Sequence, residues 1–226
     1  MLKSFEDELK PLFQDIFIGS DLGQDKINAL YSDLCAAYND DGRYYHTLEH
    51  LADLAREFDK HRNLFGEDQK ALLIALFYHD AIYNCIPGQD EKDSAALMSD
   101  QLYGIIDKNI LDRASAIILY TAHHKAPEEN HAARLFLDMD MSILGSNTEK
   151  YARYLSQVTQ EYCTAYDMSE AEFQQKRAKL FPKPTIENGR KIFTTDEYAP
   201  LETQTHENIT WELNKISGNA PMAPQP

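Results

Sequence analysis

A histidine and an aspartate, His79 and Asp80, stand side by side just after an unbroken apolar run at residues 71–76. Neutral imidazole and carboxylate are both good ligands for a divalent metal. Neighbouring side chains on a helix point about 100° apart, so an adjacent pair can form one corner of a coordination sphere. The alternative is structural, with the histidine capping the helix and the aspartate starting a turn. The metal hypothesis therefore depends on whether the chain supplies further ligands.

Histidines also occur in two other polar clusters. His46 and His50 are four residues apart, which places them on one helix face if the helix begins early enough. His123 and His124 follow the apolar residues 117–119, so a second helix ends in histidine as the first one does. Each cluster is a candidate source of metal or substrate ligands.

Two further carboxylates, Asp138 and Asp140, lie inside an apolar segment at residues 135–144. This segment is too apolar to be a solvated helix face. A buried carboxylate is costly without a partner, so these two need a metal, a cation or hydrogen-bond donors. Residues two apart on a helix point to different faces, so we do not expect both at the same ion.

The composition is that of an ordinary soluble protein, and no segment approaches the roughly 18 apolar residues of a membrane span. Three widely spaced cysteines without a CxxC pair predict reduced thiols and a cytoplasmic location. The net charge of -15 argues against a nucleic-acid polymer or an anionic membrane as partner. A small phosphorylated substrate remains compatible, because a metal or a few cations reverse the potential within one pocket.

Apolar residues recur at three- and four-residue intervals along most of the chain, which predicts an all-α fold. We expect a single domain over residues 1–216 and a disordered Pro-rich tail over residues 217–226. The apolar run belongs to a buried helix at 67–80, residues 181–184 form a turn, and residues 192–194 are a short extended piece. The other expected helices cover residues 3–18, 27–38, 47–63, 90–103, 107–123, 132–144, 151–162, 169–180 and 202–216.

The order of these clusters, with His, then His-Asp, then Asp at apolar helices, resembles the HD superfamily of metal-dependent phosphohydrolases. Residues 43–50 look like the first histidine motif of that superfamily, and residues 77–83 look like its His-Asp helix. Three more segments resemble one predicted branch of it: residues 90–95, 121–124 and 136–145. The resemblance runs from about residue 24 to 215, and it implies an HD-type helical bundle with a metal site in its core.

The resemblance also implies roles for single residues. The metal ligands it implies are His50, His79, Asp80 and Asp140, with Asp138 as the fallback for Asp140. The catalytic residues it implies are His46, Glu91 and His124. In this comparison the first is a general acid, the second orients water through the metal shell, and the third binds phosphate or a second metal.

These residue types suit the hydrolysis of a small phosphoester, either a nucleotide or another phosphorylated metabolite. Two imidazoles and two carboxylates leave open positions on Mn²⁺, Fe²⁺ or Mg²⁺, with Zn²⁺ as a further option. Such an ion lowers the pKa of bound water, while a histidine protonates the leaving group. Arg43, Lys125 and Arg134 flank the clusters, as phosphate ligands or as exposed solubilising charge. The oligomeric state stays open, and a homo-oligomer is one option.

Three alternatives remain. Residues 46–50 match the H-x-x-E-H pattern of inverted zinc proteases, in which both histidines bind Zn²⁺ and Glu49 activates water. Some HD proteins hold two irons and activate oxygen, and the additional histidines would serve a second metal. The third alternative is a non-catalytic sensor or partner-binding domain that keeps the HD fold.

Overall fold

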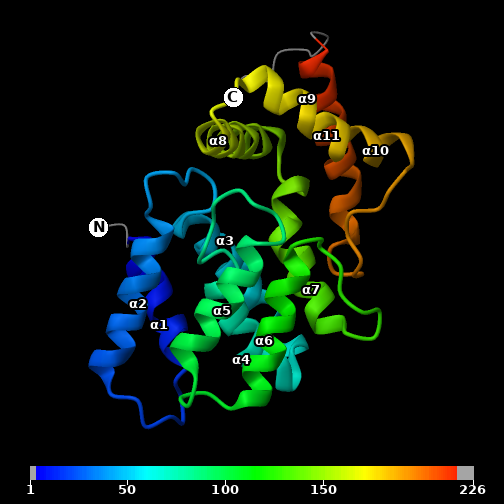
Figure 1. Ribbon diagram of the computed structural model, residues 1–226. Helices are drawn as coiled ribbons and strands as arrows, with labels where there is room; N and C mark the ends of the chain where they lie inside the picture. The colour runs from blue at the N-terminus through cyan, green and yellow to red at the C-terminus, as the bar shows by residue number, and fades with distance from the viewer. Residues whose placement is uncertain (1–3, 218–226) are drawn as a thin grey trace. The chain divides into compact units, whose positions relative to one another are not determined.

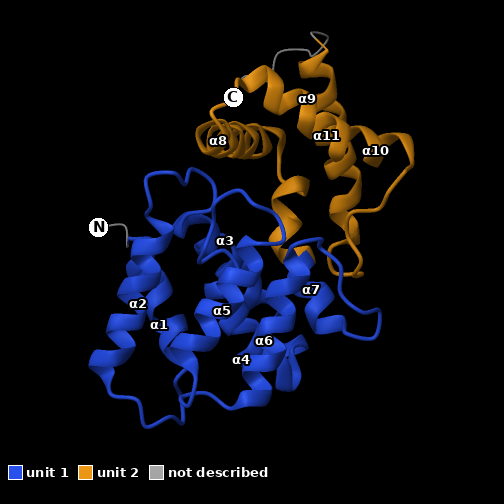
Figure 2. Ribbon diagram, in the orientation of Figure 1, with its two compact units in different colours: residues 1–137 blue, residues 138–226 orange. Residues whose placement is uncertain are grey.

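The computed structural model describes residues 4–217, and every regular element in that range is a helix, which confirms the all-α prediction. Contacts divide the chain into two compact units, residues 1–137 and residues 138–226 (Figure 2). The expected tail lies outside the described residues, apart from Ser217, and the single domain stays a prediction. Within the described range, no helix is long and apolar enough to cross a membrane.

Unit 1 is organised around α4, which α3, α5 and α6 contact (Figure 1). All eight residues from Ala71 to Tyr78 in α4 are buried. A helix that is apolar on every side has no stable place except the centre of a core. The helices of this unit are α1 (Phe5–Asp15), α2 (Gln24–Tyr38), α3 (Leu48–His61), α4 (Gln69–Tyr78), α5 (Asp90–Leu102), α6 (Lys108–Thr121) and α7 (His131–Asp140), with 3₁₀ turns η1 (Arg62–Leu64) and η2 (Gly66–Asp68). The last three residues of α7 are counted in unit 2.

Unit 2 contains the remaining helices: η3 (Met141–Gly145), α8 (Thr148–Tyr166), α9 (Glu170–Leu180), α10 (Pro182–Glu187), η4 (Ala199–Leu201) and α11 (Glu202–Ile216). A buried polar network joins three of them. The Glu212 carboxylate of α11 accepts hydrogen bonds from the Tyr151 hydroxyl and from Arg177 Nε, the latter at 2.8 Å. The indole of Trp211 lies edge-on to Tyr151, with ring centroids 6.4 Å apart. Aromatic packing and a paired buried charge thus hold α8, α9 and α11 together.

One local prediction in this unit was wrong. Residues 181–184 were expected to be a turn, but α10 begins at Pro182, because proline is favoured at the first position of a helix, where its missing N–H costs nothing. Residues 192–194 form no strand. The backbone N–H groups of Ile192 and Phe193 donate instead to the Glu202 carboxylate, at 2.9 and 3.1 Å. A side chain therefore takes the hydrogen bonds that a neighbouring strand would need.

Candidate metal centre

His79 lies directly after α4 and is 1% exposed. Its Nδ1 is 3.1 Å from the carbonyl oxygen of Leu76. Because a carbonyl only accepts hydrogen bonds, the neutral imidazole carries its proton on Nδ1 and leaves a lone pair on Nε2. The end of α4 thus fixes the tautomer in which Nε2 is the ligand atom, as metal-binding histidines require.

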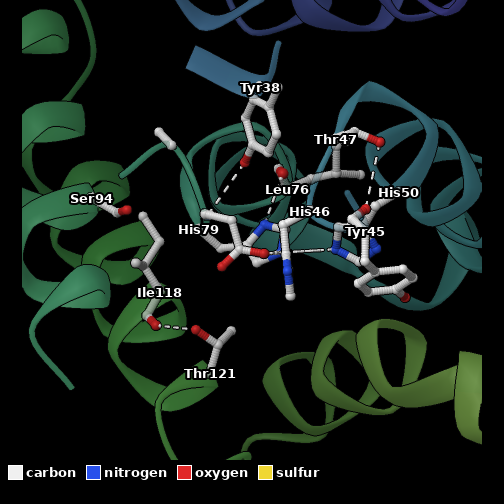
Figure 3. A network of polar contacts seen from close by, with 12 residues as sticks. Tyr38, Tyr45, His46, Thr47, His50, Leu76, His79, Ser94, Ile118 and Thr121 are labelled. Carbon is white, nitrogen blue, oxygen red and sulfur yellow. Dashed lines mark hydrogen bonds and ion pairs between the residues drawn. The ribbon is translucent and has the colours of Figure 1, made fainter. Parts of the chain in front are cut away.

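His79 Nε2 lies close to two other groups, of which the His50 imidazole is labelled in Figure 3. His79 Nε2 is 2.9 Å from Asp80 Oδ2 and 3.3 Å from His50 Nε2. A carboxylate at neutral pH has no proton to donate, so lone pairs meet at the shorter of these contacts. A proton or a cation between them is needed to offset that repulsion. A metal ion bound at this point is one way to supply that positive charge.

His50 is supplied by the first turn of α3. The Thr47 hydroxyl accepts a hydrogen bond from Glu49 N–H at 3.3 Å and so starts the helix just before His50. His50 is 5% exposed, and its Nε2 is 3.8 Å from Asp80 Oδ2. Two ligand atoms of one metal ion, each bound at roughly 2.1 Å, lie about 3 Å or more from each other. The separation of His50 Nε2 and Asp80 Oδ2 agrees with this.

Asp140, the last residue of α7, offers a further oxygen. One ligand atom each from His50, His79 and Asp140 lie within 4.8 Å of one another, and this group can hold a metal ion. Asp80 approaches the same two imidazole nitrogens. Two imidazoles and two carboxylates form the mixed nitrogen and oxygen set that divalent metals accept.

Asp138 has a different task. Its buried carboxylate accepts hydrogen bonds from Thr194 N–H at 2.9 Å, and from the N–H and the hydroxyl of Thr195, both at 2.7 Å. Burial raises the pKa of this carboxyl, and the donors from Thr195 and Thr194 oppose that rise. Of the two aspartates in the apolar segment, Asp138 binds backbone donors, while Asp140 belongs to the group that can bind a metal.

His46 does not share a helix with His50, because α3 begins at Leu48. The expectation of one helical face therefore fails for this pair. The two rings are nevertheless close, with centroids 5.7 Å apart. The H-x-x-E-H alternative places both histidines on one helix, and this geometry differs from that requirement.

Glu91 lies at the start of α5, where its Oε2 accepts a hydrogen bond from Gly88 N–H at 2.6 Å. Its neighbour Asp90 accepts from the N–H groups of Asn84 and Ile86 at 2.9 and 2.8 Å. The first turn of α5 therefore holds the loop that follows Asp80. Glu91 is not a member of the group formed by His50, His79 and Asp140.

His124 follows the end of α6 and has a φ of 47°, which is left-handed and rare for a residue with a side chain. Its N–H is 3.3 Å from the carbonyl oxygen of Thr121. His124 is likewise not a member of the converging group. Such backbone strain often occurs at functional sites, but it assigns no role by itself.

Sequence reasoning missed Tyr38 and gave Arg43 other roles, and both side chains bind the backbone of Asp80. The hydroxyl of Tyr38 accepts a hydrogen bond from Asp80 N–H at 3.3 Å. Arg43 donates to backbone carbonyls instead of acting as an exposed solubilising charge. Bonds between a side chain and a distant backbone follow no periodic pattern, so the sequence carries no signal for them.

Comparison with known proteins does not assign this chain to a family, since no family model, curated protein or solved structure matches it.

Proposed function

We propose that this chain is a metal-dependent phosphohydrolase that acts on a small phosphoester, with His50, His79, Asp80 and Asp140 as metal ligands. The observation that carries the proposal is the approach of His79 Nε2 to the Asp80 carboxylate, at 2.9 Å, and to His50 Nε2, at 3.3 Å. The resemblance of these residues to the HD pattern supplies the reaction class.

The ligand set suits Mn²⁺, Fe²⁺, Mg²⁺ or Zn²⁺. Such an ion supplies Lewis acidity, which lowers the pKa of water and polarises a phosphoryl oxygen. In the proposal, His46 donates a proton to the leaving oxygen. Its ring lies beside that of His50, and it stacks on Tyr83 with centroids 4.1 Å apart. A fixed proton donor next to the ligands is what phosphoester cleavage needs.

A small phosphorylated substrate fits the charge of the chain better than a polyanion, since the net charge is -15. All three cysteines lie in the described part of the chain and none is in a disulfide bond, which supports a reducing compartment such as the cytoplasm. The roles of Glu91 in orienting water and of His124 in binding phosphate stay part of this proposal.

A substrate and metal screen tests the function. Phosphorylated metabolites are incubated with Mn²⁺, Mg²⁺, Fe²⁺, Co²⁺ or Zn²⁺, and phosphate release is measured. We expect wild type to hydrolyse at least one of these metabolites and Asp80→Ala to hydrolyse none. The matched variant Asp100→Ala, at an exposed position of α5, should hydrolyse the same metabolites as wild type. No hydrolysis with any metal, combined with no metal retained by wild type, would overturn the proposal.

The same assays separate the alternatives. A zinc protease should digest casein and lose that activity in Glu49→Gln but keep it in Asp80→Ala, whereas the proposed phosphohydrolase depends on Asp80. Oxygen uptake by anaerobically purified, iron-loaded protein would instead favour the di-iron oxygenase. A wild type that binds metal but shows neither hydrolysis nor oxygen uptake would fit a non-catalytic sensor.

A further inference from the structure

The guanidinium of Arg43 lies where the two ligand-bearing segments of unit 1 meet. Its Nη1 donates a hydrogen bond to the carbonyl oxygen of Asp80 at 2.6 Å and another to that of His46 at 3.2 Å. Its Nη2 donates to the carbonyl oxygen of Ala81 at 2.9 Å. One side chain thus connects the chain just before α3 with the chain just after α4.

Tyr38 completes this arrangement from the end of α2. Its hydroxyl accepts a hydrogen bond from Asp80 N–H at 3.3 Å, so side chains bind both polar groups of the Asp80 backbone. The Arg43 guanidinium also lies over two aromatic rings, 4.9 Å from the centroid of Tyr38 and 5.6 Å from that of Tyr83. These rings restrict the guanidinium to the orientation that reaches the carbonyls.

The end of a helix explains why an arginine is useful here. The last carbonyls of an α-helix and those just beyond it have no partners within the helix. Arginine carries five N–H donors in a rigid planar fork and stays charged at any physiological pH. Lysine has a single nitrogen, so it cannot serve three carbonyl oxygens in the same geometry. The arrangement is specific to a guanidinium.

We propose that Arg43 is a positioning residue of the metal centre. It holds the backbone of Asp80 in place relative to the segment that carries His46 and His50, so the Asp80 carboxylate stays directed at the imidazole nitrogens. The inference rests on the proposed metal site. It also gives Arg43 a role other than phosphate binding, because three of its hydrogen bonds go to carbonyl oxygens.

Binding of Co²⁺ to the metal-free full chain tests the inference, since the visible absorption of Co²⁺ reports both affinity and coordination geometry. Arg43→Met is expected to weaken Co²⁺ binding by roughly 10- to 100-fold, as for other residues that orient metal ligands, and to change the absorption bands. Arg43→Lys should restore part of the affinity. The matched control is Arg56→Met, which removes an arginine of α3 that pairs with Glu8 and Asp53 on the surface.

Tyr38→Phe provides a second variant in case Arg43→Met does not fold, as judged by circular dichroism. It keeps the ring but removes the acceptor for Asp80 N–H, and we expect a smaller loss of affinity with a similar change in the spectrum. Wild-type affinity and spectrum in the folded Arg43 and Tyr38 variants would overturn the inference and leave the metal site intact. Absence of Co²⁺ binding by wild type would overturn the metal site itself, and the inference with it.

Discussion

The imidazole of His46 stacks on the phenol ring of Tyr83, with centroids 4.1 Å apart and ring planes inclined by 29°. His46 precedes α3 and Tyr83 follows α4, so the contact joins the segments that carry His50 and His79. Tyr45 packs edge-on against the same imidazole, with centroids 4.9 Å apart. A ring held by two neighbours keeps one orientation, and a proton donor depends on orientation.

Replacement of His46 should show whether it donates a proton. We expect His46→Gln to lower kcat by about 10²- to 10⁴-fold for a phosphoester with an alcohol leaving group. The loss should be small for p-nitrophenyl phosphate, because p-nitrophenolate leaves without being protonated. Steady-state kinetics on both substrates at saturating metal make the comparison. Equal losses on both would assign His46 another role.

Tyr83 should affect the same step through its ring. Tyr83→Leu removes the stacking surface, and we expect kcat for the alcohol leaving group to fall roughly 10-fold, since a misplaced catalytic group reacts more slowly. Tyr83→Phe keeps the ring and should retain most of the activity. If the phenylalanine variant loses as much as the leucine variant, the hydroxyl and not the stacking is what matters.

Metal binding should stabilise the fold. An ion present at 100 times its dissociation constant adds about 2.7 kcal/mol to the free energy of unfolding. For a chain of this size, that raises Tm by about 5–10 °C. Calorimetry of the EDTA-treated protein with and without Mn²⁺ should show the rise in wild type and in His131→Ala, an exposed residue of α7. The rise should be absent in His79→Ala and Asp80→Ala, and its persistence in both would place the metal elsewhere.

The two aspartates of the apolar segment should behave in opposite ways. Asp138→Asn is expected to lower the free energy of unfolding by about 1–3 kcal/mol, because one acceptor oxygen becomes an NH₂ group that faces backbone N–H at this site. Asp140→Asn should change the metal-free stability little and weaken Co²⁺ binding at least about 10-fold. Urea unfolding in EDTA and Co²⁺ titration measure the two effects. The reverse pattern would make Asp138 the ligand.

The left-handed backbone at His124 makes a prediction about stability. His124→Gly and His124→Ala remove the same imidazole, but only glycine adopts a φ of 47° without steric cost. We therefore expect the glycine variant to be more stable than the alanine variant by about 1 kcal/mol in urea unfolding. Both variants should lose phosphate affinity equally if the imidazole binds substrate. Equal stability would mean that the strained backbone relaxes once the ring is removed.

Much of the fold could be predicted because helix formation is governed by local patterns. The all-round apolar character of α4 predicts its central position, and Thr47 and Ser169 cap the helices expected at residues 47–63 and 169–180. Errors occurred where the choice between helix and turn depends on neighbours. Residues 181–184 were expected to be a turn, although proline also begins helices, as Pro182 does.

The candidate site was less predictable, because its supporting contacts join residues far apart in the sequence. A carboxylate in an apolar segment needs a cation or donors, and the sequence does not say which. The structure gives Asp138 the donors of Thr194 and Thr195, 56 and 57 residues away. Arg43 reaches the carbonyl oxygen of Asp80 across 37 residues. Only the folded chain shows these pairings.

Trp211 is the single tryptophan of the chain, and it lies in unit 2 against Tyr151. Lys215 lies over its indole ring, 5.4 Å from the centroid. Its fluorescence therefore reports the packing between α8 and α11, whereas far-ultraviolet circular dichroism reports the helices of both units. Tryptophan fluorescence thus follows the unfolding of unit 2. If the denaturant curves from the two signals coincide, the two units unfold together in one cooperative transition. If the curves differ, the units unfold one after the other.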